Sequence, residues 1–97
     1  MDLKDDELKI LRKIEKIKQT NQRTLSKSLG ISLGKVNYCI KELKKRGFIK
    51  IVNFEKSNNK LNYIYLLTPK GIKHKTKAIM NFMKIKMKEY EDLKNDL

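Results

Sequence analysis

Hydrophobic residues in the middle of the chain recur at intervals of three and four positions. Val36, Ile40 and Leu43 fall at i, i+4 and i+7, so they lie on one face of a helix. A serine that can cap a helix stands just before this segment, and a glycine that can end one follows it. The pattern predicts a helix over residues 32–46 with one face buried.

The opposite face of this predicted helix carries small, aromatic, amide and basic residues. Because successive residues turn by roughly 100°, Tyr38, Lys41 and Lys45 point away from the hydrophobic face. Such a helix suits the major groove of DNA, although a solvated helix in a lysine-rich chain has the same pattern. We interpret it as a recognition helix. Its predicted DNA contacts are Ser32, Gly34, Lys35, Asn37, Tyr38, Lys41 and Lys45.

Two further helical patterns precede the recognition helix. Residues 3–17 place leucines and isoleucines on one broad face, with acidic residues first and basic residues later, as the helix dipole favours. Residues 22–29 form a shorter pattern, which Asn21 can cap and Gly30 can end. The polar residues 18–21 are expected to form a connection. The second pattern, a short turn and the recognition helix together predict a helix-turn-helix.

The periodicity changes after the recognition helix. Residues 48–54 and 61–67 are rich in aromatic, isoleucine and leucine side chains and predict two strands around a polar tip. A hairpin directly after a recognition helix is the wing of a winged helix-turn-helix domain. The wing, residues 54–61, is predicted to meet the DNA backbone or the minor groove, the alternative being an ordinary solvated loop. The candidate contacts in it are Lys56, Asn58, Asn59 and Lys60.

The last helix begins at Thr68 and Pro69, because threonine caps helices and proline is favoured at the first helical position. No later proline interrupts it, so it can run for roughly 40 Å, which is longer than a small core can cover. Its apolar stripe therefore predicts a partner, and we expect a second copy of the chain. The predicted dimer contacts are Ile79, Met83, Met87, Tyr90 and Leu93. We divide the chain into a DNA-binding domain, residues 1–68, and a dimerisation helix, residues 69–97.

The charge of the chain supports a polyanionic partner. Its 97 residues carry a net charge of +13, from 24 lysines and arginines against 11 acidic residues. The acidic residues gather towards the two ends, and none occurs in residues 56–88. A basic middle of this kind favours nucleic acid or an anionic membrane surface.

Several other classes of protein are not indicated. The single cysteine, Cys39, rules out an intrachain disulfide; we expect a small buried side chain and a reducing, cytoplasmic location. No apolar run is long enough to span a membrane. The single histidine, His74, has no evident partner and is expected on the surface. No nucleophile with a base, phosphate loop or metal-ligand cluster can be assembled, so no enzymatic activity, cofactor or metal is expected.

Three segments resemble the MarR-type winged-helix transcription regulators, in particular a small branch named for its association with exopolysaccharide genes. These segments are residues 29–38, 59–72 and 86–93, and the resemblance spans most of residues 20–93. It implies a cytoplasmic, dimeric, DNA-binding regulator. The chain departs from the larger members in its short first helix, so no small-molecule ligand is expected.

Together these observations predict a mainly α fold with a small β-hairpin (α+β), in which a winged helix-turn-helix precedes a long helix. The expected function is that of a sequence-specific regulator that binds double-stranded DNA as a homodimer. A two-fold dimer favours a palindromic operator. Two alternatives stay open, namely a winged-helix protein-interaction module and a protein that binds structured RNA.

Overall fold

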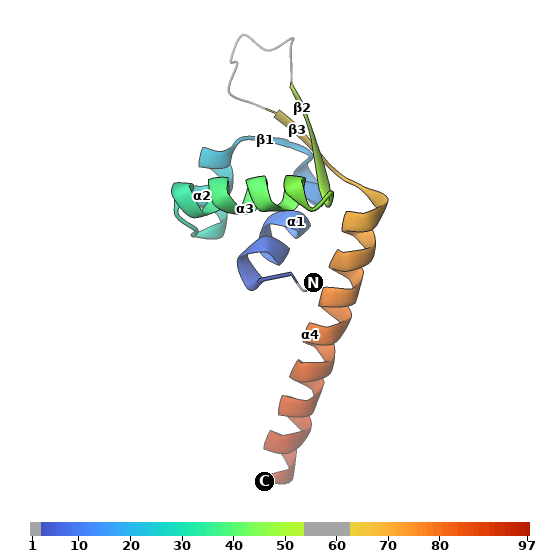
Figure 1. The fold of residues 1–97 in the computed structure, drawn as a ribbon. Coiled ribbons are helices and arrows are strands. Elements are labelled where there is room, and N and C mark those ends of the chain that lie inside the picture. The colour runs from blue at the N-terminus through green and yellow to red at the C-terminus, as the bar shows by residue number, and fades with distance from the viewer. Residues whose placement is uncertain (1–2, 54–62) are drawn as a thin grey trace.

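The computed structural model describes residues 3–53 and 63–97 of the chain (Figure 1). Helices dominate it, together with a small antiparallel sheet, which confirms the predicted fold class. The elements in chain order are α1 (Asp5–Ile17), β1 (Gln19–Thr20), α2 (Gln22–Leu29), α3 (Leu33–Lys45), β2 (Ile49–Asn53), β3 (Tyr63–Leu67) and α4 (Pro69–Asn95).

The hydrophobic core lies where α1, α2 and α3 pack against one another and against the sheet. The predicted inward face of α3 is confirmed, since Val36, Ile40 and Leu43 are all buried. Cys39 is also buried beside them, as expected. The remaining buried apolar residues are Ile10, Leu11, Ile14, Leu25, Ile31, Phe48, Ile49 and Tyr65.

The helix caps agree with the sequence pattern. The Asn21 side chain accepts a hydrogen bond of 2.8 Å from the backbone N–H of Thr24 at the start of α2. Ser32 accepts one of 3.2 Å from the backbone N–H of Lys35 at the start of α3. Gly30 ends α2 with φ +68°, a left-handed conformation that favours glycine. The helix-turn-helix is therefore defined by its caps as well as by its core.

The sheet has one strand more than the sequence pattern predicts. Residues 18–21 were expected to be only a connection, but β1 within them pairs antiparallel with β3 and gives the strand order β1-β3-β2. The carbonyl of Lys18 accepts a 2.7 Å hydrogen bond from the backbone N–H of Tyr65. A two-residue strand has too few positions to show an alternating pattern, so only its partner on β3 reveals it. The strands β2 and β3 lie within the two predicted segments, and the predicted tip lies outside the described residues.

The helices α1, α2 and α3 and the sheet together form the head of the molecule. Helix α4 is joined to this head through Phe48, the residue before β2. The backbone N–H of Thr68 donates to the Phe48 carbonyl at 3.1 Å, and the Thr68 hydroxyl caps α4 by accepting from Gly71 at 3.0 Å. Gly71 is buried directly against the Phe48 backbone. The His74 ring stacks on the Phe48 ring with centroids 4.6 Å apart. His74 lies at the surface, as the sequence predicts, but the stacking leaves it half-buried.

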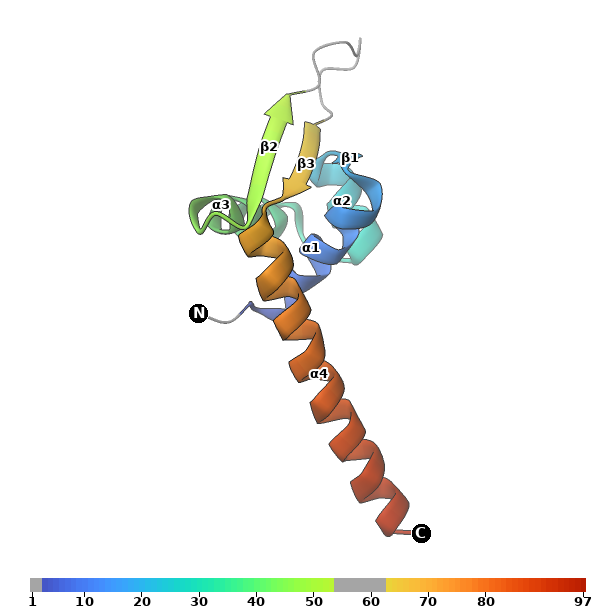
Figure 2. The same ribbon diagram turned by 90° about the vertical axis from the view of Figure 1, so that its right-hand side faces the viewer.

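Beyond this junction α4 extends away from the head. Figures 1 and 2 show its C-terminal half and the strands β2 and β3 projecting in opposite directions from the three-helix core. The described chain is accordingly elongated, with extents of 58 × 26 × 20 Å. Every side chain from Met80 to Leu97 is exposed, as expected for a helix that outruns its own core.

The close approach of Gly71 to Phe48 makes a testable prediction about stability. A Cβ atom at Gly71 would lie 2.0 Å from the Phe48 carbonyl oxygen, so the backbone would have to move. We expect Gly71→Ala to lower the free energy of unfolding by about 3 kcal/mol in urea denaturation. Gly34→Ala is the matched control, because a Cβ there meets nothing within 4 Å. It should stabilise α3 by about 0.5–1 kcal/mol, and equal effects of the two changes would contradict the prediction.

Candidate nucleic-acid interface

The outward face of α3 is the candidate DNA-reading surface. Gly34, Tyr38, Lys41 and Lys45 are all exposed, Tyr38 to 56%, opposite the buried residues of the same helix. Asn37 is half-buried at the edge of this face, and Ser32 is exposed at its beginning. Helical periodicity thus brings six of the seven predicted α3 residues to one exposed side or its edge.

The seventh predicted residue, Lys35, lies on the flank of α3 that faces α1. Its Nζ forms an ion pair of 2.9 Å with the Oδ2 of Asp6. The hydrogen bond to Asp6, and then the negative charge of the same carboxylate, raise the pKa of the Lys35 ammonium above its usual value. Both side chains keep contact with solvent, Lys35 at 61% and Asp6 at 25% exposure. Lys35 is therefore accessible, but it already has an anionic partner.

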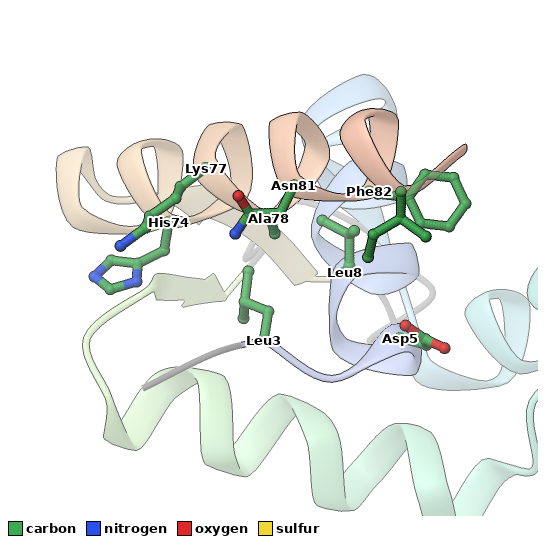
Figure 3. Close-up of a pocket in the computed structure, with 9 residues that line it drawn as sticks. Leu3, Asp5, Leu8, His74, Lys77, Ala78, Asn81 and Phe82 are labelled. Atoms are coloured by element: carbon green, nitrogen blue, oxygen red, sulfur yellow. The ribbon is translucent and has the colours of Figure 1, made fainter. Parts of the chain in front are cut away.

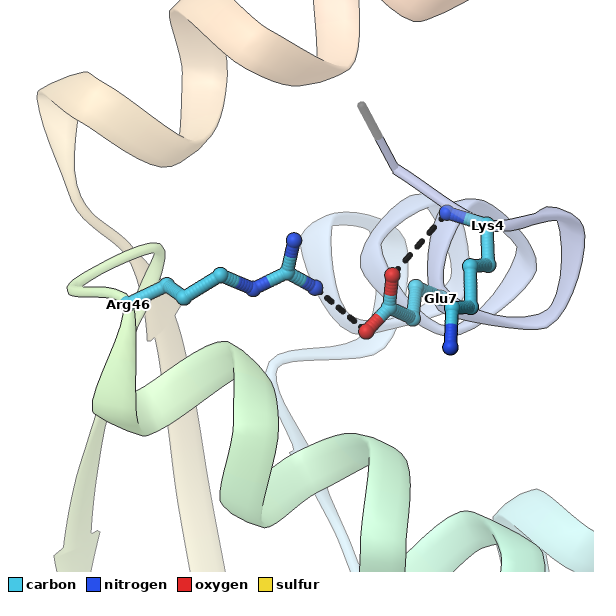
Figure 4. A network of polar contacts seen from close by, with 3 residues as sticks. All are labelled: Lys4, Glu7 and Arg46. Carbon is cyan, nitrogen blue, oxygen red and sulfur yellow. Dashed lines mark hydrogen bonds and ion pairs between the residues drawn. The ribbon is translucent and has the colours of Figure 1, made fainter. Parts of the chain in front are cut away.

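A second ion pair joins the other end of α3 to the same turn of α1. Arg46 donates to one carboxylate oxygen of Glu7, and the backbone N–H of Lys4 donates to the other at 2.9 Å (Figure 4). The pair is mostly buried, with side-chain exposures of 16% for Arg46 and 3% for Glu7. The Arg46 guanidinium also lies 5.0 Å from the centroid of the Phe48 ring.

These two contacts add to the sequence interpretation of the first turn of α1. The helix dipole favours carboxylates there, and Asp6 and Glu7 in addition pair with cations near the two ends of α3. The partners are 29 and 39 residues away in the chain (35 − 6 and 46 − 7). No local pattern could have revealed such distant pairs, and they hold α3 to α1 near both of its ends.

The sequence analysis did not include α2 in the candidate surface. A depression of about 430 Å³ lies between α2, the start of α3 and β3. Arg23 and Lys27 line it from α2, and Leu33 and Tyr63 line it from the other side. Arg23 and Lys27 are both exposed and are spaced i, i+4, so they share one face of α2. That spacing was the available signal for a second basic surface beside α3.

The predicted wing contacts Lys56, Asn58, Asn59 and Lys60 lie outside the described residues. The base of the hairpin is described, and Lys50, Val52 and Tyr63 are exposed there. The strands β2 and β3 project beyond α3 on the side away from the C-terminus (Figure 1).

A groove between α1 and the middle of α4 lies away from the candidate DNA-reading surface. It contains two adjoining depressions of about 320 and 370 Å³, and Leu8 and Phe82 line both (Figure 3). The predicted dimer residues Ile79 and Met83 line the second depression. The sequence analysis missed Phe82 because it lies beside the predicted stripe. The other predicted dimer residues, Met87, Tyr90 and Leu93, are exposed further along α4.

The surroundings of two potentially reactive side chains shift their pKa values in the direction that favours the neutral form. Burial, followed by the nearby Glu7 and Asp6, raises the pKa of the Cys39 thiol. Desolvation, followed by nearby positive charges that include Lys70, lowers the pKa of His74. Within residues 3–53 and 63–97, no three His, Cys, Asp or Glu side chains come together as metal ligands would. None of the helices in these ranges combines the length and apolar character that a membrane crossing requires.

Comparison with known proteins defines the class of this fold. Residues 7–50, from the start of α1 into β2, match a family model described as winged helix-turn-helix DNA-binding. A search of curated proteins finds no match. The elements that carry the candidate surface therefore have the winged helix-turn-helix fold.

Solved structures of transcription regulators have a similar fold. A mutant MarR from E. coli, complexed with operator DNA, gives a TM-score of 0.66 at 21% identity, over 79% of this chain and 54% of that one. PcaV from Streptomyces coelicolor, in complex with its natural ligand, gives 0.76 at 14% identity, over 88% and 59%. BldR from Sulfolobus solfataricus gives 0.80 at 16% identity, over 93% and 63%. The predicted resemblance to MarR-type regulators is confirmed for the fold, and the chain spans less than two thirds of each of these proteins.

The buried ion pair of α1 and α3 makes a second prediction about stability. Glu7→Gln leaves the Arg46 guanidinium without its anionic partner, and breaking a buried pair costs about 3 kcal/mol. The midpoint of urea unfolding, followed by circular dichroism, should fall accordingly. The matched control is Glu15→Gln, which removes the partner of Lys75 in a more exposed pair. It should change the free energy of unfolding by less than about 1 kcal/mol. A smaller effect at Glu7 than at Glu15 would contradict this account.

Proposed function

We propose that this protein is a transcription regulator that binds specific sequences of double-stranded DNA as a homodimer. The observation that carries the proposal is the exposed face of α3, with an aromatic ring and two lysines standing opposite a fully buried stripe. The match of residues 7–50 to a DNA-binding winged helix-turn-helix model supports it. So does the fold shared with a MarR that was solved on operator DNA.

In this proposal α3 enters the major groove. Asn37 has the amide that pairs with adenine, and Tyr38 reaches a thymine methyl group or a sugar. Ser32 and Gly34 let the start of the helix approach the bases closely. Lys41 and Lys45 bind phosphates, which give affinity and orientation without sequence information.

Two neighbouring elements would add contacts to the DNA backbone. On one side, Arg23 and Lys27 of α2 face the depression beside the start of α3 and would bind phosphates. The wing residues would bind the backbone or the minor groove beside the major-groove site. The proposed wing contacts are Lys56, Asn58, Asn59 and Lys60.

We further propose that residues 1–68 read the DNA and residues 69–97 hold the dimer together. The stripe of Ile79, Met83, Met87, Tyr90 and Leu93 continues past the end of the core and leaves apolar surface in water. A second copy that covers this stripe would place two recognition helices about one DNA turn apart, which favours a palindromic operator. The acidic residues near the end of α4 would then lie near lysines of the partner, because an antiparallel or crossed pairing brings opposite charges together.

This function needs no catalytic group and no cofactor, and its site of action is the cytoplasm or nucleoid, where the DNA is. A structured-RNA binder and a protein-interaction module are the competing functions. Titration of the purified protein with its selected DNA duplex, a scrambled duplex and duplex RNA separates the three. We expect tightest binding to the selected duplex. Equal affinity for RNA, or no binding to any nucleic acid at low salt, would contradict the proposal.

The first prediction from this proposal concerns the outward face of α3. Lys41→Glu with Lys45→Glu should abolish binding to the selected duplex, measured by fluorescence anisotropy, because both changes place anions against phosphates. Circular dichroism should show unchanged folding, since both side chains are exposed. The matched control is Lys73→Glu with Lys88→Glu, which makes the same charge change at exposed positions of α4. If both pairs weaken binding equally, the effect comes from net charge and α3 is not the reader.

Base recognition by the same helix has a different signature. Asn37→Ala and Tyr38→Ala should each reduce the preference for the selected duplex over a scrambled one by about 1–3 kcal/mol. The affinity for the scrambled duplex should stay nearly constant, because phosphate contacts supply it. A parallel loss on both duplexes would show that these side chains do not read sequence.

The next prediction concerns the apolar stripe of α4. Met83→Glu with Tyr90→Glu should produce a monomer in sedimentation velocity, with much weaker binding to the selected duplex. Lys84→Ala with Lys88→Ala is the control on the same turns of the helix, and it should leave the dimer intact. Sedimentation of the unmodified protein as a monomer at tens of micromolar would refute the dimer.

A further inference from the structure

The Asp6–Lys35 ion pair sits beside the proposed DNA-binding surface. Lys35 lies in the first turn of α3, next to Gly34 and one turn before Tyr38. In a helix that enters the major groove, the first turns approach the DNA most closely. A lysine at this position can reach a phosphate, but in the free protein its Nζ lies 2.9 Å from the Oδ2 of Asp6.

The physical character of this pair differs from that of its neighbour on α1. The Glu7–Arg46 pair is mostly buried, so its partners cannot separate without leaving a charge out of water. The Asp6–Lys35 pair is largely exposed on the lysine side, and exposed pairs contribute little to stability. Asp6 itself lies in the first turn of α1, where the helix dipole favours a carboxylate even without a cationic partner. Lys35 can therefore leave Asp6 at small cost to the fold.

We propose that Asp6 is an internal competitor for DNA, which holds Lys35 in the free protein and must be displaced by a phosphate when the duplex binds. This inference rests on the proposed function and adds an affinity-setting residue to it. At this point of the surface, DNA binding then has one favourable and one unfavourable contribution to its free energy. Lys35 gains a phosphate, while Asp6 loses its partner and stays close to a polyanion.

In a chain with a net charge of +13, such a competitor lowers the unspecific affinity for polyanions. A strongly basic protein binds any polyanion, and phosphate contacts dominate that unspecific affinity. An anion that neutralises one cation beside the reading helix lowers this unspecific affinity. The base contacts proposed for Asn37 and Tyr38 stay unaffected, so the competitor leaves sequence preference in place.

The neighbouring residue Asp5 provides a matched control. Asp5 is exposed on the same turn of α1, but it lines the groove between α1 and α4. Asp5→Asn and Asp6→Asn therefore make the same change in net charge one residue apart. Only the second change removes the partner of Lys35.

The experiment measures the affinity for the selected duplex by fluorescence anisotropy over a series of salt concentrations. We expect Asp6→Asn to tighten binding by about two- to fivefold, the scale of an exposed ion pair. The log–log salt slope should become steeper by about one unit. In the unmodified protein Asp6 takes up a cation when Lys35 leaves it, which offsets one released counterion. Asp5→Asn should have a clearly smaller effect, and Asp6→Glu should restore behaviour close to that of the unmodified protein.

A double-mutant cycle tests whether Asp6 affects DNA binding through Lys35. Lys35→Ala alone should weaken binding, and Asp6→Asn should then lose most of its effect, because the side chain that it releases is gone. Thermal unfolding of each variant checks that the fold is retained. Equal effects of Asp5→Asn and Asp6→Asn, or an undiminished effect of Asp6→Asn in the Lys35→Ala background, would overturn the inference while leaving the proposed function in place. Failure of the unmodified protein to bind the selected duplex would overturn both.

Discussion

The architecture depends on the contact between the backbone of Phe48 and the first turn of α4. Thr68 donates to the Phe48 carbonyl, and Gly71 packs against the same peptide so closely that no side chain fits between them. The Phe48 ring is buried, with His74 stacked on it and the Arg46 and Lys70 cations 5.0 and 5.5 Å from its centroid. This residue joins the end of α3, the start of the hairpin and the start of α4. The direction of α4 relative to α3 is set here.

The hydrophobic core and the polar contacts of α1 together fix the position of α3. The buried stripe of α3 fixes which face of that helix points outward, because the opposite side chains must lie in the core. The Glu7–Arg46 pair then ties the C-terminal end of α3 to α1. Asp6 makes a weaker contact with the N-terminal end. One turn of α1 thus combines a buried pair and a more exposed pair, and we propose that only the second exchanges its cation with DNA.

The long helix α4 connects the head to surface that the head cannot cover. Its first turns pack on Phe48, and its middle forms one wall of the groove with α1. Its last turns are exposed, although they carry Met87, Tyr90 and Leu93. If a second copy covers this surface, the rigid junction at Phe48 places the two recognition helices at a defined separation. The reading of DNA and the pairing of two chains would then be linked through one helix.

The sequence alone determined the local elements, because capping and periodicity are encoded within a few neighbouring residues. Asn21, Ser32 and Thr68 start their helices as their side chains predict, and Val36, Ile40 and Leu43 reveal which face of α3 is buried. The outward residues of α3 followed directly from that face. The long apolar stripe of α4 was also readable, since it repeats along a single helix.

Only the tertiary structure decided the contacts between segments that are distant in the chain. The strand β1 exists because β3 lies beside it, and two residues carry no pattern of their own. The partners of Asp6 and Glu7 could not be read from the sequence, since a carboxylate in a first helical turn also satisfies the dipole without any partner. The sequence around Gly71 gives no sign of the close approach of the Phe48 backbone, which lies 23 residues earlier in the chain (71 − 48). These features depend on how the elements meet in space, and that arrangement is set by packing rather than by the local sequence.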